Sequence, residues 1–242
     1  MKTLVIIPAY NEAENIVRVV DQLIAQYPQY DYIIVNDGSR DETPAICREK
    51  GYRLLDLPIN LGLAGAFQAG MRYARRNEYD AAIQFDADGQ HRAEYIAPLI
   101  DKLSEGYHIA VGSRFVTVPK PISLRMLGSF LISFAIRLTT GKKLTDPTSG
   151  MRVYNKAMIH QYARHVNRAP EPDTLSYLIK QGAKVAEVQV EMDERIAGES
   201  YLDFTRSIAY MLRMGVSIIL VQPFRGKINI STKENKGGEV LA

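Results

Sequence analysis

Short apolar runs alternate with helix-like segments through the first half of the chain, and this alternation restricts the fold more than any other feature. Such runs are typical of buried parallel strands, and the intervening segments have the periodicity of helices. The alternation predicts an α/β fold with a Rossmann-like, doubly wound and mostly parallel sheet. The predicted strands are 3–7, 32–35, 53–57, 81–85 and 109–112, and the predicted helices are 12–26, 43–50, 62–77 and 93–105.

Polar loops directly follow four of the predicted strands. In an open α/β sheet, ligands bind beyond the carboxyl ends of the strands, where these loops meet. We therefore expect one binding site at that edge of the sheet. The loops are "PAYNE" (8–12), "NDGSRDET" (36–43), "DADGQH" (86–91) and "SRF" (113–115).

The second half of the chain has two long amphipathic segments, 122–140 and 202–225. The first holds only eleven uncharged residues between two arginines, and the second has Arg213 in mid-run, so neither is expected to span a bilayer. Both are suited to lie in a membrane interface. It is equally open that these segments pack against the domain, a second copy of the chain or a small membrane protein. Residues 226–242 are expected to form a polar, disordered tail.

Charge and cysteine content exclude some classes of protein. The formal net charge of +3 gives no indication of nucleic-acid binding. The single cysteine, Cys47, cannot form an intramolecular disulfide and fits a reducing compartment. The apolar run at the N-terminus is too short for a signal peptide. We therefore expect a cytoplasmic protein, peripheral on the cytosolic face of a membrane.

Asp86 and Asp88 lie one residue apart at the end of the apolar run "AAIQF". Two carboxylates this close repel each other unless a cation binds between them, and Mg²⁺ or Mn²⁺ prefers oxygen ligands. A turn at Gly89 would direct both side chains toward one centre, and Gln90 would add a carbonyl oxygen as a further ligand or orient a metal-bound water. Because Mg²⁺ binds through few carboxylates plus substrate phosphates, the expected ligand is a diphosphate. The alternative is a helix-capping loop with solvated acids.

The loops after the first two strands suit a nucleotide. Tyr10 would stack on a base, and Glu12 and Asp37 would accept hydrogen bonds from ring N–H groups or ribose hydroxyls. The glycine-rich segment 60–70 matches neither the dinucleotide-binding fingerprint nor the P-loop.

The motifs "PAYNE", "VNDGSRDET", "NLGLAGA", "DADGQH", "VGSRF", "DPTSGMR" and "ERIAGESYL" occur in the order seen in family 2 glycosyltransferases with the GT-A fold. Within that family, the chain most resembles the dolichyl- or polyprenyl-phosphate sugar synthases. The likeness implies a catalytic domain over 1–201 and inverting transfer of a sugar from a UDP- or GDP-linked donor. It departs from the family at Asn36, where an acid is frequent, at Tyr201, where lysine is frequent, and in 167–179, where many relatives have a glutamate-bearing helix.

The resemblance also implies residue roles. Nucleotide-sugar contacts would come from Pro8, Ala9, Tyr10, Glu12, Asp37, Asp86, Ala87, Arg114 and Arg195. Asp86, Asp88 and Gln90 would hold the metal ion, and the catalytic set would be Asp88, Arg114, Asp146 and Arg195.

The nature of the acceptor decides whether a base is needed. A sugar hydroxyl needs a carboxylate base, whereas a phosphate monoester is already largely dianionic and needs cations to position it. Cations accompany the amphipathic segments, so the first hypothesis is transfer to dolichyl or undecaprenyl phosphate, with Arg125, Arg152 and Ser200 as acceptor contacts. The second is glycan extension in cell-wall or capsular polysaccharide assembly. Asp146 would then be the base, or would otherwise orient Arg152; Glu171 and Asp173 are the fallback bases. The third is a non-catalytic nucleotide-sugar sensor or membrane-docking subunit.

Overall fold

The computed structural model describes residues 1–121, 123–164, 169–193, 204–228 and 230. Its centre is a seven-stranded sheet, within the described residues, with the order β3-β2-β1-β4-β6-β5-β7. All strands run parallel except β6, which is antiparallel to both of its neighbours. The strands are β1 Thr3–Ala9, β2 Asp31–Asn36, β3 Leu54–Asp56, β4 Ala81–Gln84, β5 Ile109–Ser113, β6 Arg152–Asn155 and β7 Val185–Gln189.

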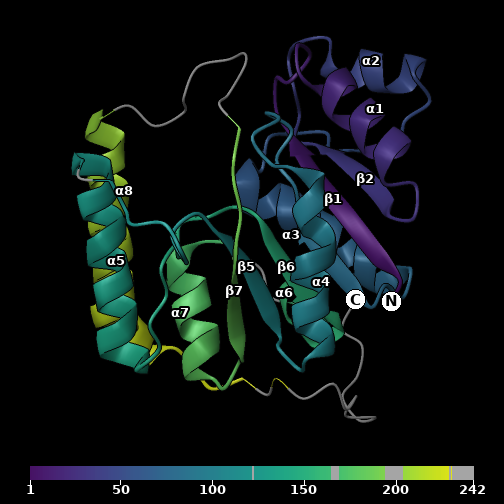
Figure 1. Cartoon of the computed structure of the whole chain (residues 1–242). Coiled ribbons are helices and arrows are strands. Elements are labelled where there is room, and N and C mark those ends of the chain that lie inside the picture. The colour runs from purple at the N-terminus through teal and green to yellow at the C-terminus, as the bar shows by residue number, and fades with distance from the viewer. Residues whose placement is uncertain (122, 165–168, 194–203, 229, 231–242) are drawn as a thin grey trace.

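Helices cover both faces of this sheet (Figure 1). The helices are α1 Ile16–Gln26, α2 Thr43–Glu49, α3 Gly62–Arg76, α4 Ile96–Ser104, α5 Leu124–Thr140, α6 Lys156–Arg164, α7 Pro172–Lys180 and α8 Phe204–Val216. A short 3₁₀ turn, η1 Ala93–Tyr95, precedes α4. After α8 come a π-helical stretch, η2 Ser217–Val221, and a 3₁₀ turn, η3 Gln222–Phe224.

The central strands are buried on both faces, which explains their nearly continuous apolar sequences. In β1, Leu4 and Ile6 belong to one core cluster, and Val5 and Ile7 belong to the cluster on the opposite face. Successive side chains of a strand point to opposite faces, so one short run contributes to two cores. The five predicted strands are confirmed, and the α/β, mostly parallel fold is confirmed with them.

The predicted helix 12–26 begins later, at Ile16, because the preceding turn has its own bonds. Asn11 has a left-handed backbone conformation with a φ of 56°. Its amide N donates to Ser39 Oγ, and its Oδ1 accepts from the amide N of Arg40. These bonds join the turn after β1 to the loop after β2.

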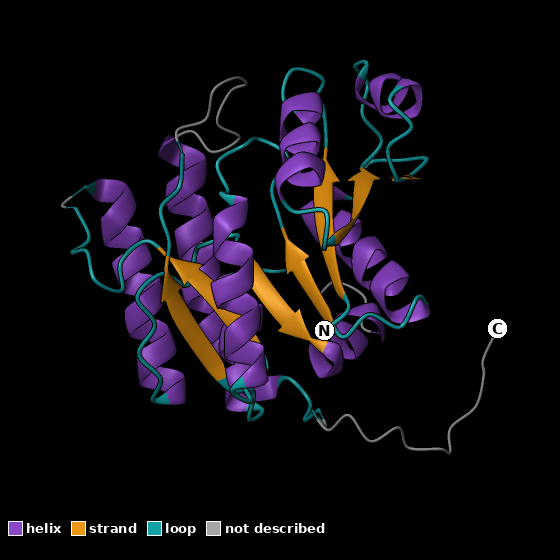
Figure 2. Cartoon of the chain, turned by 45° about the vertical axis from the view of Figure 1, so that its right-hand side comes forward, coloured by secondary structure: helices purple, strands orange, loops and turns teal. Residues whose placement is uncertain are grey.

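The helices α5 and α8 pack against each other at one side of the molecule, next to α7 (Figures 1 and 2). Ile132 and Ile136 of α5, and Met214 and Ile218 from α8 and η2, belong to the main core cluster. A side chain at Gly128 would overlap Met211 of α8, so the two helices are in close contact there. The predicted amphipathic segments are thus partly integrated into the core.

The start of the predicted disordered tail is corrected by the structure. The Tyr177 hydroxyl of α7 donates to the carbonyl of Gly226, and the amide N of Ile228 donates to Gln181 Oε1. Ile228 and Ile230 also pack against the core. Apolar side chains at 228 and 230 explain why the chain stays on the domain beyond residue 225. Residues 231–242 lie outside the described residues.

Candidate active site

The loop after β4 brings Asp86 and Asp88 to the same cavity, which has a volume of about 750 Å³. Gly89 between them and α4 has a left-handed φ of 80°, and it makes the turn that redirects the chain. The Asp86 side chain is 35% exposed, and Asp88 Oδ1 accepts a hydrogen bond from the amide N of Gln90 at 3.0 Å. Gln90 lines the cavity too. The predicted metal and diphosphate ligands therefore lie together.

Two neighbours orient the Asp86 carboxylate. Gln84 Nε2 donates to Asp86 Oδ1 at 3.0 Å. His91 Nδ1 accepts from the Asp86 amide N at 2.9 Å, and His91 Nε2 lies 3.5 Å from Asp86 Oδ2. An accepting Nδ1 places the proton of a neutral imidazole on Nε2, facing the carboxylate. Gln84 and His91 thus hold the Asp86 carboxylate in one orientation at the cavity.

Arg114 lines the cavity and is held by Asp146, which is fully buried. Asp146 Oδ2 accepts from Arg114 Nε at 2.6 Å, and Oδ1 accepts from Arg114 Nη2 at 3.0 Å. Thr148 Oγ1 donates to the same carboxylate at 3.0 Å. Asp146 therefore positions Arg114, and the prediction that it orients Arg152 is wrong. The carboxylate is already engaged and is not part of the cavity wall, which disfavours it as a base.

Arg152 forms part of the cavity floor at the start of β6 and is only 1% exposed. Its Nε donates to the carbonyl of Ser149 at 2.9 Å, and its Nη2 donates to the carbonyl of Pro147 at 2.6 Å. Its Nη1 has no hydrogen-bond acceptor among the described residues. The guanidinium is thus held by two backbone carbonyls, while its buried Nη1 has no acceptor among the described residues.

Of the two fallback bases, only Glu171 reaches the cavity. Burial raises its pKa, and Arg213 of α8 lies 3.0 Å from its Oε1. Asp173 instead binds Ser217 Oγ at 2.8 Å and Arg225 Nη2 at 3.0 Å. Asp173 therefore anchors the segment after α8, and its prediction as a base has no support in its position.

The predicted nucleotide contacts gather at the ends of β1 and β2. Pro8 and Ala9 pair in register with Val35 and Asn36, and the amide N of Asp37 donates to the Ala9 carbonyl. Asp37 is buried, and its Oδ1 accepts from the amide N of Leu61 at 2.7 Å. None of these residues lines the cavity. The group consists of Pro8, Ala9, Tyr10, Glu12 and Asp37; Ala87 is buried in the loop after β4.

Three predicted contacts remain without a structural account. Arg195 and Ser200 lie outside the described residues, as does the side chain of Arg125.

The far end of the cavity is formed by α5 and α8. Met126, Ser129 and Ile132 of α5 line it, together with Ala209, Tyr210, Met211 and Arg213 of α8. The cavity thus changes from acidic and polar at the sheet edge to a wall with more apolar side chains, and with one arginine, between the two helices.

Lys120, between β5 and α5, adjoins this end and was missed by the sequence analysis. Its Nζ donates to Ser129 Oγ at 3.0 Å and to Ser133 Oγ at 3.4 Å. The signal available in the sequence is the i, i+4 spacing of the two serines within the uncharged stretch between Arg125 and Arg137.

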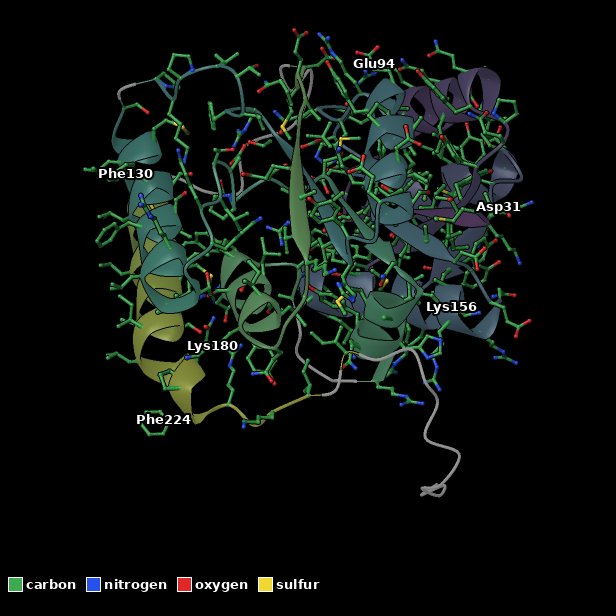
Figure 3. All side chains as sticks on the ribbon, turned by 60° about the horizontal axis from the view of Figure 1, so that its bottom comes forward. Asp31, Glu94, Phe130, Lys156, Lys180 and Phe224 are labelled. Atoms are coloured by element: carbon green, nitrogen blue, oxygen red, sulfur yellow. The ribbon has the colours of Figure 1, made fainter. Side chains whose placement is uncertain are left out.

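The outer sides of α5, α8 and the turns after α8 carry large exposed apolar side chains. Figure 3 shows Phe130 and Phe224 on this outer side. Within the described part of the chain, every helix falls short of the length and apolar character that crossing a bilayer requires. The exposed residues are Leu127, Phe130, Leu131, Phe134, Leu138, Leu212, Val216, Ile219, Leu220, Val221 and Phe224.

The sequence of the chain matches a known protein family and several characterised relatives. Residues 4–163 match the model of glycosyl transferase family 2. The chain is 30% identical over 212 residues to polyprenol monophosphomannose synthase of Mycolicibacterium smegmatis, covering 82% of this chain and 80% of the relative. It is 30% identical over 213 residues to undecaprenyl-phosphate mannosyltransferase of Micrococcus luteus, covering 83% and 87%.

Solved structures share the fold at lower identity. Glucosyl-3-phosphoglycerate synthase from Mycobacterium tuberculosis, in complex with Mn²⁺, UDP and glucosyl-3-phosphoglycerate, matches with a TM-score of 0.64 and 19% identity. The match covers 91% of this chain and 79% of that one. A mannosyltransferase from Pyrobaculum calidifontis, in complex with GDP-Man and Mn²⁺, matches with a TM-score of 0.60 and 16% identity, covering 92% and 68%. The chain has the GT-A fold and belongs to glycosyl transferase family 2.

Proposed function

We propose that this chain is an inverting hexosyltransferase that moves a sugar from a UDP- or GDP-linked donor to polyprenyl phosphate at the cytosolic face of a membrane. The observation that carries the proposal is one cavity with paired carboxylates at its sheet end and apolar helices at its other end. A charged sugar nucleotide suits the first end, and a lipid chain suits the second. The similarity to polyprenol- and undecaprenyl-phosphate mannosyltransferases supports the same acceptor class.

The donor end fits a divalent cation. Asp86 and Asp88 face one cavity across the turn at Gly89, and Gln84 and His91 already orient Asp86. These carboxylates, with Gln90, would hold Mg²⁺ or Mn²⁺. The bound ion would neutralise charge that develops on the departing nucleoside diphosphate. Arg114, fixed by Asp146, would add a positive charge at a set position without reorganising during the reaction.

The acceptor then supplies the nucleophile. An oxygen of the phosphate monoester attacks the anomeric carbon from the face opposite the leaving group, which inverts that carbon. The bond to the nucleoside diphosphate breaks, and its electron pair leaves with the diphosphate. Because the monoester is already largely dianionic near neutral pH, no protein base is needed. The proposed acceptor contacts are Arg125, Ser200 and Arg152, which lines the cavity and whose Nη1 has no acceptor among the described residues.

The exposed apolar side of α5 and α8 supports peripheral contact with a membrane. Phe130, Phe134 and Leu220 are all more than half exposed, and Arg137 and Lys142 are exposed in or just after α5. An apolar surface with neighbouring cations suits the interface of an anionic bilayer. A lipid acceptor would then reach the cavity from the membrane.

The purified chain tests this proposal with each common UDP- and GDP-sugar, with Mg²⁺ or Mn²⁺, and with polyprenyl phosphate or the matched uncharged polyprenol. We expect transfer to polyprenyl phosphate alone, giving an alkali-stable and acid-labile glycolipid. Transfer to a free oligosaccharide, without dependence on lipid phosphate, would reject the proposal.

One observation favours a second candidate, the transfer of the sugar to a glycan hydroxyl. Glu171 lines the cavity, and burial raises its pKa, as expected of a general base. Glu171→Gln separates the two functions. Lost turnover with intact donor binding would support the hydroxyl acceptor, whereas retained transfer to polyprenyl phosphate supports the lipid acceptor.

A further inference from the structure

Lys120 adjoins the apolar end of the cavity, and its close partners among the described residues are hydroxyl groups and an aromatic ring. Its Nζ donates to the hydroxyls of Ser129 and Ser133 and lies 5.5 Å from the ring centroid of Phe115. Among the residues that the structure describes, no carboxylate oxygen lies within 4.0 Å of this ammonium group. By contrast, Arg114 is paired with Asp146.

The surroundings of Lys120 disfavour its charged form, so the side chain is a poor choice for stabilising the fold. Removal from water lowers the pKa of Lys120, and the nearby Arg114 guanidinium acts in the same direction, although the Asp146 and Glu187 carboxylates partly offset both. A partly buried charge without a close counter-ion costs folding free energy. A hydrophobic residue of the same length would avoid that cost. The placement therefore indicates a role in binding an anion that comes from outside the chain.

Ser129 connects this ammonium group to the cavity. On α5, Met126, Ser129 and Ile132 face the cavity, and Ser129 is the polar member of that row. It is buried, and its Oγ is the closer of the two hydroxyl contacts of Lys120. The positive charge thus lies directly behind the one hydroxyl on the α5 wall, at the apolar end of the cavity.

We propose that Lys120, acting through Ser129, positions the phosphate monoester of the acceptor at the apolar end of the cavity. This inference rests on the proposed function and adds a residue that holds the attacking phosphate beside the lipid-facing helices. Lys120 is a positioning residue. Its charge attracts the dianion, and its hydrogen bond leaves the Ser129 hydroxyl proton free to donate to a phosphate oxygen, because a hydroxyl both accepts and donates.

The test compares Lys120→Met and Lys120→Arg with the control Lys156→Met, an exposed lysine on α6. Initial rates are measured against polyprenyl phosphate and, separately, against the sugar nucleotide, and Tm is measured for each variant. For Lys120→Met we expect the KM for polyprenyl phosphate to rise about tenfold to a hundredfold, because the dianion loses a nearby positive charge that attracts it. The KM for the donor should stay within about twofold, and Tm should be unchanged or higher because the unpaired charge is gone. Lys120→Arg keeps the positive charge, so its KM for polyprenyl phosphate should be close to the wild-type value.

Inorganic phosphate and glycerol 3-phosphate provide a second readout with soluble ligands. If the subsite recognises the phosphate group itself, both should inhibit the wild-type protein competitively with the lipid, and Lys120→Met should weaken that inhibition. If only the lipid phosphate binds, neither soluble anion should inhibit, while the change in lipid KM persists.

If Lys120 only holds the segment after β5 against α5, the measurements should differ from those expected above. A fall in Tm with donor and acceptor KM changed together, or an unchanged acceptor KM in the folded variant, would overturn the inference. If Lys120→Met does not fold, Ser129→Ala replaces it, and an unchanged acceptor KM there is equally decisive. Failure of the wild-type chain to glycosylate polyprenyl phosphate would instead reject the proposed function, which is a separate result.

Discussion

Replacing Arg114 with methionine leaves the Asp146 carboxylate buried without its counter-ion. Asp146 is fully buried and accepts two side-chain bonds from Arg114, at 2.6 and 3.0 Å. Removing one partner of a buried ion pair costs about 3–5 kcal/mol, because the remaining charge is uncompensated. Such a loss is a large part of the roughly 5–15 kcal/mol that stabilises a typical domain. In urea unfolding, with a slope of about 2–3 kcal/mol per molar, the midpoint should fall by about 1–2.5 M.

The partner variant Asp146→Asn should cost less, about 1–3 kcal/mol, because Arg114 is 28% exposed and can be partly hydrated. The double variant should be more stable than the sum of the single effects predicts, by about 1–3 kcal/mol. Asp101→Asn, which removes an exposed carboxylate of α4, is the control and should change the midpoint little.

Two outcomes would refute this reasoning. The first is a loss of less than about 1 kcal/mol for Arg114→Met, which would mean that the pair is not buried as described. The second is an Asp146→Asn variant with an unchanged urea midpoint and turnover lowered about a hundredfold or more, as expected for the loss of a catalytic base. Both measurements use the same purified variants.

Three further predictions concern the metal site, the apolar surface and pH. Asp86→Asn or Asp88→Asn should weaken Mn²⁺ binding in the presence of UDP by at least about tenfold, measured by electron paramagnetic resonance; unchanged binding would mean that the carboxylates do not hold the ion. Phe130→Gln with Phe134→Gln should lower partitioning onto anionic vesicles by about 1–2 kcal/mol per ring at an unchanged Tm, whereas dissociation of an oligomer in light scattering would assign the surface to a second copy. His108 accepts from the Lys184 amide N, and burial lowers its pKa, so the neutral form is favoured in the folded state. The stability it provides is present above about pH 6.5 and is lost as pH falls through the lowered pKa, so His108→Asn, which keeps an acceptor, should reduce the fall in Tm between about pH 8 and about pH 5.5. An equal fall in both proteins would contradict the assignment.

The first half of the fold is readable from sequence because its strands are buried on both faces and give continuous apolar runs, as in "TLVII". The second half is not. The strand β6 has the sequence "RVYN" and begins with a buried arginine, so neither its length nor its pattern identifies a strand in the middle of a sheet. Its antiparallel direction depends on pairing with β4 and β5, which local sequence does not encode.

The candidate site divides in the same way. Asp86, Asp88 and Gln90 are close in sequence and share one loop, so their common location was predictable. The Arg114–Asp146 pair joins residues separated by 32 positions, and only the folded sheet shows which arginine the aspartate holds. The contacts of Lys120 likewise depend on how the segment after β5 folds back onto α5. The sequence indicated which residue types belong to the site, but it did not show which distant residues contact each other.

The reversed strand β6 also affects how the chain is completed during synthesis. Both of its neighbours, β4 and β5, are translated earlier, and neither has its full set of partners until β6 emerges. Until then the nascent sheet has open, apolar edges that can pair with other chains. A polypeptide truncated before residue 152 should therefore aggregate instead of forming a smaller stable domain, and holding of the nascent chain by a chaperone would matter most over that interval.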